Sequence, residues 1–225
     1  MNRWIAVILF VMAPLAGAAS LDHILIGVPK LDEGVAAFEK ATGVRAQYGG
    51  KHPSGGTENA LVSLGDGAYL EIIAPRADAD ANDGLAWYLR SLKEPVLVGW
   101  AVRVSDAAAA RELVHKNGFE VSDAKPGSRI KPDGKKLEWT TFGVDENAMA
   151  TAPFFIQWSA STTHPSESSP GGCSLIRFEL ADPEADDLSR LLQLLGVAVP
   201  VRAAERPHMQ LQLRCGEREA SFASE

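Results

Sequence analysis

The chain has 225 residues, of which 46% are hydrophobic and 23% charged, and it contains 20 glycines and 13 prolines. This is the composition of an ordinary folded protein, and it excludes collagen-like, low-complexity and disordered chains. The formal net charge of −7 disfavours nucleic acid as a partner, because an acidic surface repels phosphate groups. Two cysteines are too few for a disulfide-dense scaffold or a cysteine-rich zinc site.

The first 19 residues have the pattern of a secretory signal peptide. Arg3 precedes an uncharged run over residues 4–19, which is shorter than the about 20 residues that span a bilayer. The run ends in small residues, so we predict cleavage near Ala18-Ala19-Ser20 and a periplasmic or secreted mature chain without a stable membrane anchor. An uncleaved anchor and a buried core helix are the alternatives.

Export would place Cys173 and Cys215 in an oxidising compartment, where they are candidates for a disulfide. Closing a loop of this length would stabilise the fold by about 4 kcal/mol in the chain-entropy model. The alternative is a pair of buried thiols, and the sequence leaves both open.

Beyond residue 20 the chain repeats one pattern, an apolar strand followed by an amphipathic helix that ends at a glycine. Residues 21–43 and 97–118 both show this pattern, and a shorter third copy spans 173–196 with an alternating strand after it, at 208–215. Three probable strands follow each of the first two copies: 44–48, 58–64 and 68–73 in the first, and 119–122, 137–142 and 154–158 in the second.

The order β-α-β-β-β, found twice, predicts an α+β fold with two curved antiparallel sheets, each backed by a helix. We therefore predict paired βαβββ modules at residues 20–76 and 96–158. A linker at 159–172, rich in Ser, Pro and Gly, separates them from a partial third βαββ module at 173–225 that packs on the same domain. His164 in this linker is predicted to be solvated.

Strand alternation places one histidine and one glutamate on the same open face of the first module. In the first strand the aliphatic side chains alternate with His23, so His23 points away from the helix. In the strand at 68–73, Glu71 alternates with Leu70 and Ile72 in the same way. An imidazole beside a carboxylate is a donor pair that binds divalent cations.

The motifs LDHI and YLEII, which begin and end a repeated βαβββ module, resemble the vicinal oxygen chelate superfamily. This superfamily includes glyoxalase I, extradiol dioxygenases, fosfomycin-resistance transferases and bleomycin-binding proteins. The stretches GGKHPSGGTENALVSLGDGAYLEIIAP, PGSRIKPDGKKLEW and PFFIQW are similar, more narrowly, to bacterial glyoxalase-like domain proteins. The resemblance covers residues 21–215 and implies the fold, on which the superfamily carries many chemistries.

The resemblance implies a metal site that takes a His and a Glu from equivalent strands of both modules. His23 and Glu71 match this pattern, whereas the second module has Gly99, which has no donor, and Gln157, a candidate ligand through its neutral amide oxygen. His52 is a candidate third ligand and, with Glu71, a candidate catalytic group, unless it is an ordinary loop histidine. The implied cofactor is a divalent ion: Zn, Mn, Fe or Ni.

Three further polar side chains are candidates for substrate binding. Arg103 has the strand parity of Gly99, so its guanidinium would point into the second module's cup and bind a carboxylate or phosphate. Asn59 would hydrogen-bond a ligand, and Arg129 would reach the cup from a hairpin. A structural ion pair, a turn cap and a surface position are the respective alternatives.

Together these features predict an exported, metal-dependent lyase, isomerase or dioxygenase acting on a small anionic carbonyl or enediol-type compound. A metal-free protein that binds or sequesters a small molecule in the same cup is one alternative, and Gly99 and Gln157 favour it. A structural domain whose cup is filled by its own third module is another. A homodimer is also compatible with the resemblance, because superfamily members pair modules within or between chains.

Overall fold

The computed structural model describes residues 19–80, 84–145 and 149–225. The predicted signal segment therefore lies outside the described residues, except for Ala19. In the part of the chain that is described, no helix is long and apolar enough to cross a membrane.

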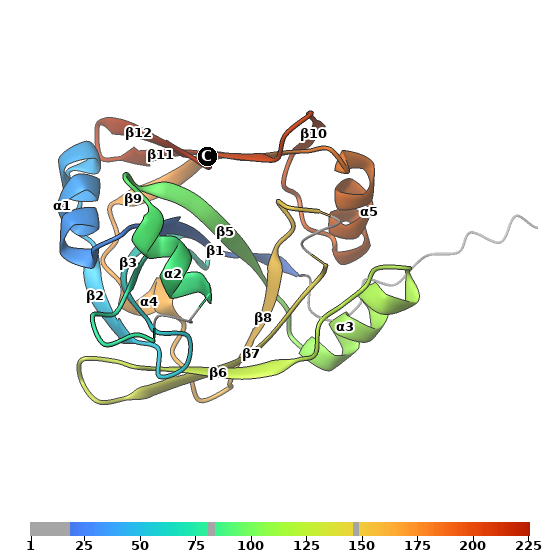
Figure 1. Cartoon of the computed structure of the whole chain (residues 1–225), viewed down its shortest axis with the longest axis horizontal. Helices are drawn as coiled ribbons and strands as arrows, with labels where there is room; N and C mark the ends of the chain where they lie inside the picture. Colours follow the sequence, from blue (N-terminus) through green and yellow to red (C-terminus); the bar gives the residue numbers. More distant parts are fainter. Residues whose placement is uncertain (1–18, 81–83, 146–148) are drawn as a thin grey trace, which may run out of the picture.

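Eight strands form a closed barrel in the order β1-β4-β3-β2-β6-β7-β8-β5, which confirms the α+β prediction (Figure 1). The first module supplies β1 (Ser20–Gly27), β2 (Gln47–Lys51), β3 (Thr57–Gly65) and β4 (Ala68–Pro75). The second supplies β5 (Val96–Arg103), β6 (Lys125–Ile130), β7 (Lys136–Gly143) and β8 (Phe154–Trp158). Both halves of the barrel thus come from one chain.

The strand directions differ from the predicted pair of antiparallel sheets. β1 pairs with β4 in parallel, and β5 pairs with β8 in parallel, so the barrel is mixed. In each module the chain leaves its first strand through a helix and two further strands, a crossover long enough to return in the same direction. The two modules meet where β1 pairs with β5, antiparallel, and where β2 pairs with β6.

The second strand of each module begins later than predicted. Residues 44–48 were expected to form a strand, but β2 covers Gln47–Lys51; residues 119–122 contribute only one bridge, and β6 covers Lys125–Ile130. The position of β2 follows from barrel closure, because Lys51 pairs with Ile130. Gly50 has φ of 134°, and a Cβ there would lie 2.0 Å from the Ile130 carbonyl oxygen, so only glycine permits this approach.

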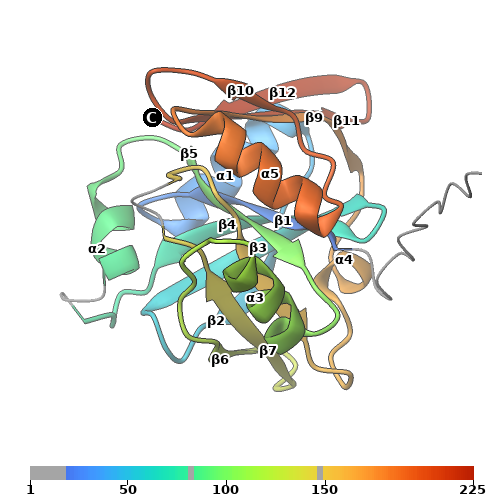
Figure 2. The same cartoon turned by 90° about the vertical axis from the view of Figure 1, so that its right-hand side faces the viewer.

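The described residues form five helices around the barrel: α1 (Leu31–Thr42), α2 (Gly84–Ser91), α3 (Ala107–Lys116), α4 (Pro165–Ser168) and α5 (Ala185–Leu195). Helix α1 ends as predicted at Gly43, which adopts the left-handed conformation with φ of 77°. The sequence pattern missed α2 and α4. The two helices overlap in Figure 1, and the turned view shows them on opposite sides of the barrel (Figure 2).

The C-terminal residues form a separate four-stranded sheet with helix α5, in the element order β-α-β-β-β. The strand order in the sheet is β10-β9-β11-β12, with β9 at Cys173–Asp182, β10 at Val201–Ala203, β11 at His208–Cys215 and β12 at Arg218–Ala223. Here the first strand lies inside the sheet and pairs with the strand directly after the helix, unlike β1 and β5. A disulfide joins Cys173 to Cys215 across β9 and β11.

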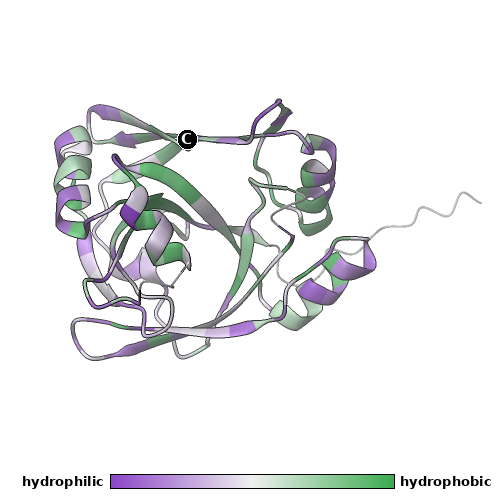
Figure 3. Ribbon diagram, viewed as in Figure 1, coloured by the Kyte–Doolittle hydropathy of each residue, from purple (hydrophilic) through white to green (hydrophobic). Residues whose placement is uncertain are grey.

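The core lies between this sheet and the outer face of the barrel. Trp100 of β5 and Phe178 of β9 have ring centroids 5.4 Å apart, and Phe38 of α1 stacks on Phe222 of β12 at 5.8 Å. The helices mix hydrophilic and hydrophobic residues along their length, whereas β1 and β5 of the barrel are largely hydrophobic (Figure 3). The polar side chains inside the barrel are therefore exceptions to its composition.

Candidate functional site

One cavity of about 700 Å³, here called the polar cavity, is lined by residues from β1, β3, β4, β6, β7 and β8. His23 from β1 and Glu71 from β4 both line it, on the face opposite the helix-facing Ile24 and Leu70. The two polar side chains are buried, with 3% and 5% of their surface exposed. The structure therefore has the strand alternation from which the sequence placed His23 and Glu71 on the same face.

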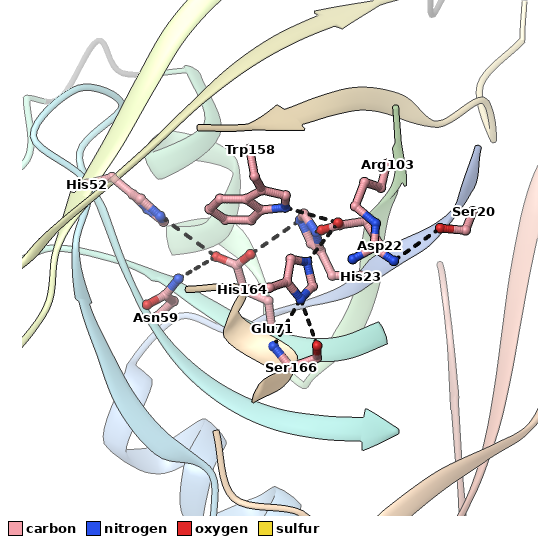
Figure 4. A network of polar contacts seen from close by, with 10 residues as sticks. All are labelled: Ser20, Asp22, His23, His52, Asn59, Glu71, Arg103, Trp158, His164 and Ser166. Atoms are coloured by element: carbon pink, nitrogen blue, oxygen red, sulfur yellow. Dashed lines mark hydrogen bonds and ion pairs between the residues drawn. The ribbon is translucent and has the colours of Figure 1, made fainter. Parts of the chain in front are cut away.

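The Glu71 carboxylate lies at the centre of a polar network (Figure 4). Its Oε2 is 3.5 Å from His23 Nε2, and its Oε1 is 3.9 Å from His52 Nε2. Asn59 donates a hydrogen bond from Nδ2 to Oε1 at 2.8 Å. The two imidazoles thus face different oxygens of one carboxylate, which lies between them.

Each histidine is held on its other ring nitrogen. His23 Nδ1 lies 2.6 Å from Asp22 Oδ1, and His52 Nδ1 lies 2.8 Å from Thr57 Oγ1. Partners of this kind fix the orientation of an imidazole and so decide which nitrogen faces the cavity. Tyr69 stacks on the His23 ring at 4.6 Å and restrains it further. Both histidines therefore present Nε2 toward Glu71.

Asp22 is a central residue of the site that the sequence analysis missed. It is fully buried, and its Oδ2 accepts hydrogen bonds from Trp158 Nε1 and from His164 Nε2, each at 3.0 Å. Burial alone would raise the pKa of Asp22, but the hydrogen bonds from His164 and His23 and their charges hold it well below its usual value. Asp22 is therefore ionised at neutral pH.

A β-bulge explains why alternation did not reveal Asp22. The β1–β5 register shifts between Leu21 and His23, so Asp22 does not follow the regular pleat and can bond to its own neighbour. The prediction that His164 is solvated is wrong: the chain around α4 folds back toward the barrel, and His164 is only 8% exposed. A carboxylate within an otherwise apolar strand was the signal available for Asp22.

Arg129 and Asn59 also lie in the polar cavity, where Arg129 Nη1 donates to Asn59 Oδ1 at 3.3 Å. Arg129 is 3% exposed; burial lowers its pKa, and the charge of Glu71 opposes that change. Gly49 on β2 makes the approach possible, because a Cβ there would lie 2.2 Å from Arg129 Nη1 and 2.4 Å from Asn59 Oδ1. A fixed positive charge is thereby positioned beside the carboxylate.

Two predicted site residues lie outside the polar cavity. Gln157 Oε1 accepts a hydrogen bond from the backbone N–H of Ala107 at 2.9 Å, at the start of α3. The predicted equivalence of Gln157 with Glu71 is wrong, because Phe154, Ile156 and Trp158 are the β8 residues that face the cavity. Arg103, at the end of β5, donates from Nη2 to Ser20 Oγ at 3.3 Å (Figure 4).

The side chains as arranged do not fit a divalent ion. Among the residues that the structure describes, no group of three or more His, Cys, Asp or Glu side chains is arranged to hold a metal. The Glu71 carboxylate lies between His23 and His52, with a different oxygen facing each imidazole (Figure 4). The guanidinium of Arg129 adds a positive charge beside this carboxylate, which opposes a second cation.

Two βαβββ modules that close one barrel around a polar cavity define the vicinal oxygen chelate class of fold. Within that class, the model of the glyoxalase-like domain family matches residues 21–196, and the chain belongs to this family. None of the curated proteins matches the chain.

Solved structures share the fold at low sequence identity. A hypothetical protein from Staphylococcus aureus is 18% identical with a TM-score of 0.62, and the match covers 92% of this chain and 86% of that one. Methylmalonyl-CoA epimerase from Mycobacterium tuberculosis is 18% identical with a TM-score of 0.46, over 69% of this chain and 95% of its own. A hypothetical protein from Bacillus halodurans is 16% identical with a TM-score of 0.47, over 64% and 96%.

Proposed function

We propose that the polar cavity is the active site of an enzyme that transfers a proton on a small anionic carbonyl or enediol-type compound. The observation that carries the proposal is the buried Glu71 carboxylate, which lines a cavity of about 700 Å³ beside two imidazoles and a guanidinium. A carboxylate that faces such a cavity and is held in place by its neighbours is a suitable proton acceptor. Isomerases and lyases both begin with this step.

In the proposed step Glu71 takes a proton from the carbon next to the substrate carbonyl. The electron pair of the broken C–H bond forms a C=C bond, and the π pair of the carbonyl moves to its oxygen, which gives an enolate. Arg129 binds the anionic group of the substrate, because a guanidinium matches the geometry of a carboxylate. Burial lowers the pKa of His52, so its imidazole is neutral at pH 7 and offers Nε2 to the developing enolate oxygen.

The experiment that tests this step also tests the metal-dependent form of the prediction. The resemblance implies Zn, Mn, Fe or Ni, but the proposed step uses only side chains whose contacts are described above. Exchange that appears only after one of these ions is added would show that the histidines and Glu71 rearrange around it. Exchange that proceeds in the presence of a chelator supports the step as written.

The test follows solvent deuterium into a panel of small 2-oxo acids and α-hydroxy carbonyl compounds by ¹H NMR in D₂O. Loss of a general base costs about 100-fold or more in rate, so Glu71→Gln should abolish enzyme-dependent exchange. Glu58→Gln is the matched control, because Glu58 lies on the adjacent strand β3 and bonds to the exposed Tyr48 instead of facing the cavity.

Two results would overturn the proposal. One is exchange no faster than in buffer for every compound, with and without added ions; the other is exchange that Glu71→Gln leaves unchanged. Tight binding of a panel member without exchange would instead support the alternative of a binding or sequestration protein, in which Arg129 and the aromatic walls retain a ligand.

We further propose that the mature chain begins at Ser20 and acts in the periplasm or outside the cell. Two observations support this: β1 begins at Ser20, and the Cys173–Cys215 disulfide is of a kind that forms in oxidising compartments. N-terminal sequencing of the chain from cell fractions tests it, and an intact Met1 in the cytosol would overturn it. One chain supplies all eight strands of the barrel, so the two copies of a homodimer would have to meet through other surfaces. Light scattering tests whether such a homodimer forms.

A further inference from the structure

A second cavity of about 630 Å³, here called the apolar cavity, lies between α2, β5 and the C-terminal residues. Among the described residues that line it, Glu225 is the one with a charged side chain. The polar cavity has many more charged side chains in its lining. Together with two histidines, it is lined by five of them: Glu71, Asp123, Lys125, Arg129 and Asp145. Charge is thus confined largely to one of the two spaces.

The two cavities are direct neighbours. Five uncharged residues line both of them: Leu25, Leu85, Gly143, Val144 and Phe154. Leu25 lies on β1 between the polar His23 and the close-packed Gly27, and Phe154 contacts the His23 ring edge-on at 5.4 Å. These five residues therefore form the boundary between the polar cavity and the apolar cavity.

Gly99 contributes to the floor of the apolar cavity. It lies on β5 opposite Leu25 of β1, and a Cβ built on it meets no heavy atom within 4 Å. Its backbone lies outside the left-handed region, so no conformational demand for glycine explains this residue. The missing side chain leaves open space at the position where the resemblance places a ligand in the second module.

We propose that the substrate is amphiphilic, with an anionic carbonyl head in the polar cavity and an unbranched apolar tail that passes Leu25 and Phe154 into the apolar cavity. The inference rests on the proposed function, because Glu71 and Arg129 hold the head. The separation of charged from uncharged lining side chains between two adjoining spaces matches a ligand with a charged head and an uncharged tail. A wholly polar substrate would leave the second space without a partner.

The test measures binding of straight-chain 2-oxo acids of increasing length by quenching of tryptophan fluorescence, since Trp139 and Trp158 line the polar cavity. Burial of each added CH₂ group should tighten binding about fourfold once the tail enters the apolar cavity. Gly99→Leu should fill part of that space, abolish the gain for long acids and leave the Kd of the shortest acid unchanged. Gly171→Leu is the matched control, at another glycine with open space around its Cβ.

Competition gives a readout that does not depend on folding of a variant. In the wild-type protein, 1-octanol should weaken binding of the longest acid and leave that of the shortest unchanged, because it competes only for the apolar cavity. Kd values that do not change with chain length would overturn the inference while the proposed function stands. A length dependence that persists in Gly99→Leu, or equal competition at both lengths, would also overturn it. Failure of every acid to bind or exchange would refute the proposed function itself.

Discussion

Asp22→Asn is the substitution that tests the architecture of the site most directly. Asp22 accepts three N–H groups, from His23, His164 and Trp158, with no exposed surface. An asparagine oxygen in the place of Oδ2 retains His164 and Trp158 as donors but places its NH₂ group against His23 Nδ1. A hydrogen bond to a charged group contributes about 1.5–3 kcal/mol, and the two retained bonds also lose their charge. We expect the free energy of unfolding to fall by about 3 kcal/mol.

The same substitution should alter His23 itself. Because the amide NH₂ can only donate, Nδ1 must accept, and the proton of a neutral His23 moves to Nε2, the nitrogen that faces Glu71. Deuterium exchange should therefore slow even under conditions where the variant is fully folded. A purely structural role for Asp22 would lower stability and leave the exchange rate of the folded protein unchanged.

The pH dependence gives a third readout. The pKa of Asp22 is lower in the folded protein than its ordinary value of 3.8, so its carboxylate stabilises the fold above about pH 4 and loses that contribution as the pH falls. The wild type should therefore be more sensitive to acid below pH 4 than Asp22→Asn.

Urea unfolding, followed by tryptophan fluorescence at several pH values, measures these effects. Asp182→Asn is the control, because Asp182 is a buried carboxylate that accepts from Thr151 outside the polar cavity. It should lose stability but keep the exchange rate of the folded protein. A loss below about 1 kcal/mol in Asp22→Asn, together with an unchanged exchange rate, would refute the reasoning.

Three further outcomes are expected. In Gly49→Ala the new methyl group would displace Arg129, so the Kd of a short 2-oxo acid in calorimetry should rise about tenfold, the loss of one charged contact; an unchanged Kd would contradict its role. Because burial lowers the pKa of His52 below 6.5, wild-type stability should fall as the pH drops from 6.5 toward 5, and urea midpoints of His52→Gln should lack that part of the slope. The double variant Cys173→Ser/Cys215→Ser, whose positions are 42 residues apart, should lose about 4 kcal/mol in urea unfolding, and a loss below about 1 kcal/mol would contradict a stabilising disulfide.

The repeated modules and the pairing of His23 with Glu71 were predictable from the sequence. In both strands, aliphatic residues at every second position define one buried face, so the polar residue between them must lie on the other. The face on which each residue lies follows from the alternation within its own strand, without knowledge of how the strands pair. Barrel closure required more, because it depends on β2 meeting β6 and on Gly50, whose approach to Ile130 joins two modules far apart in the chain.

The errors have physical causes in particular residues. In the strand FFIQW the residues Phe154, Phe155 and Ile156 are all apolar. The alternation of apolar and polar residues therefore did not show which face of this strand points into the barrel, and Gln157 was assigned to the wrong face. Asp22 lies at a bulge, where the period-two rule on which the prediction depended does not hold. His164 comes from a polar segment whose return to the barrel depends on a hydrogen bond to Asp22, and no local pattern encodes such a contact.

The two modules, although built alike, contribute differently to the site. The first supplies His23, His52, Asn59 and Glu71, whereas β8 of the second faces the cavity with Phe154, Ile156 and Trp158. The second module does supply one charge that approaches Glu71, from Arg129 on β6, and Gly49 of the first module makes room for it. Under the proposed function, the proton-transfer groups lie in the first module, and the second module, which has Gly99 in place of a donor, mainly shapes the space for the substrate. Substrate length should then affect binding more than a second set of ligands would.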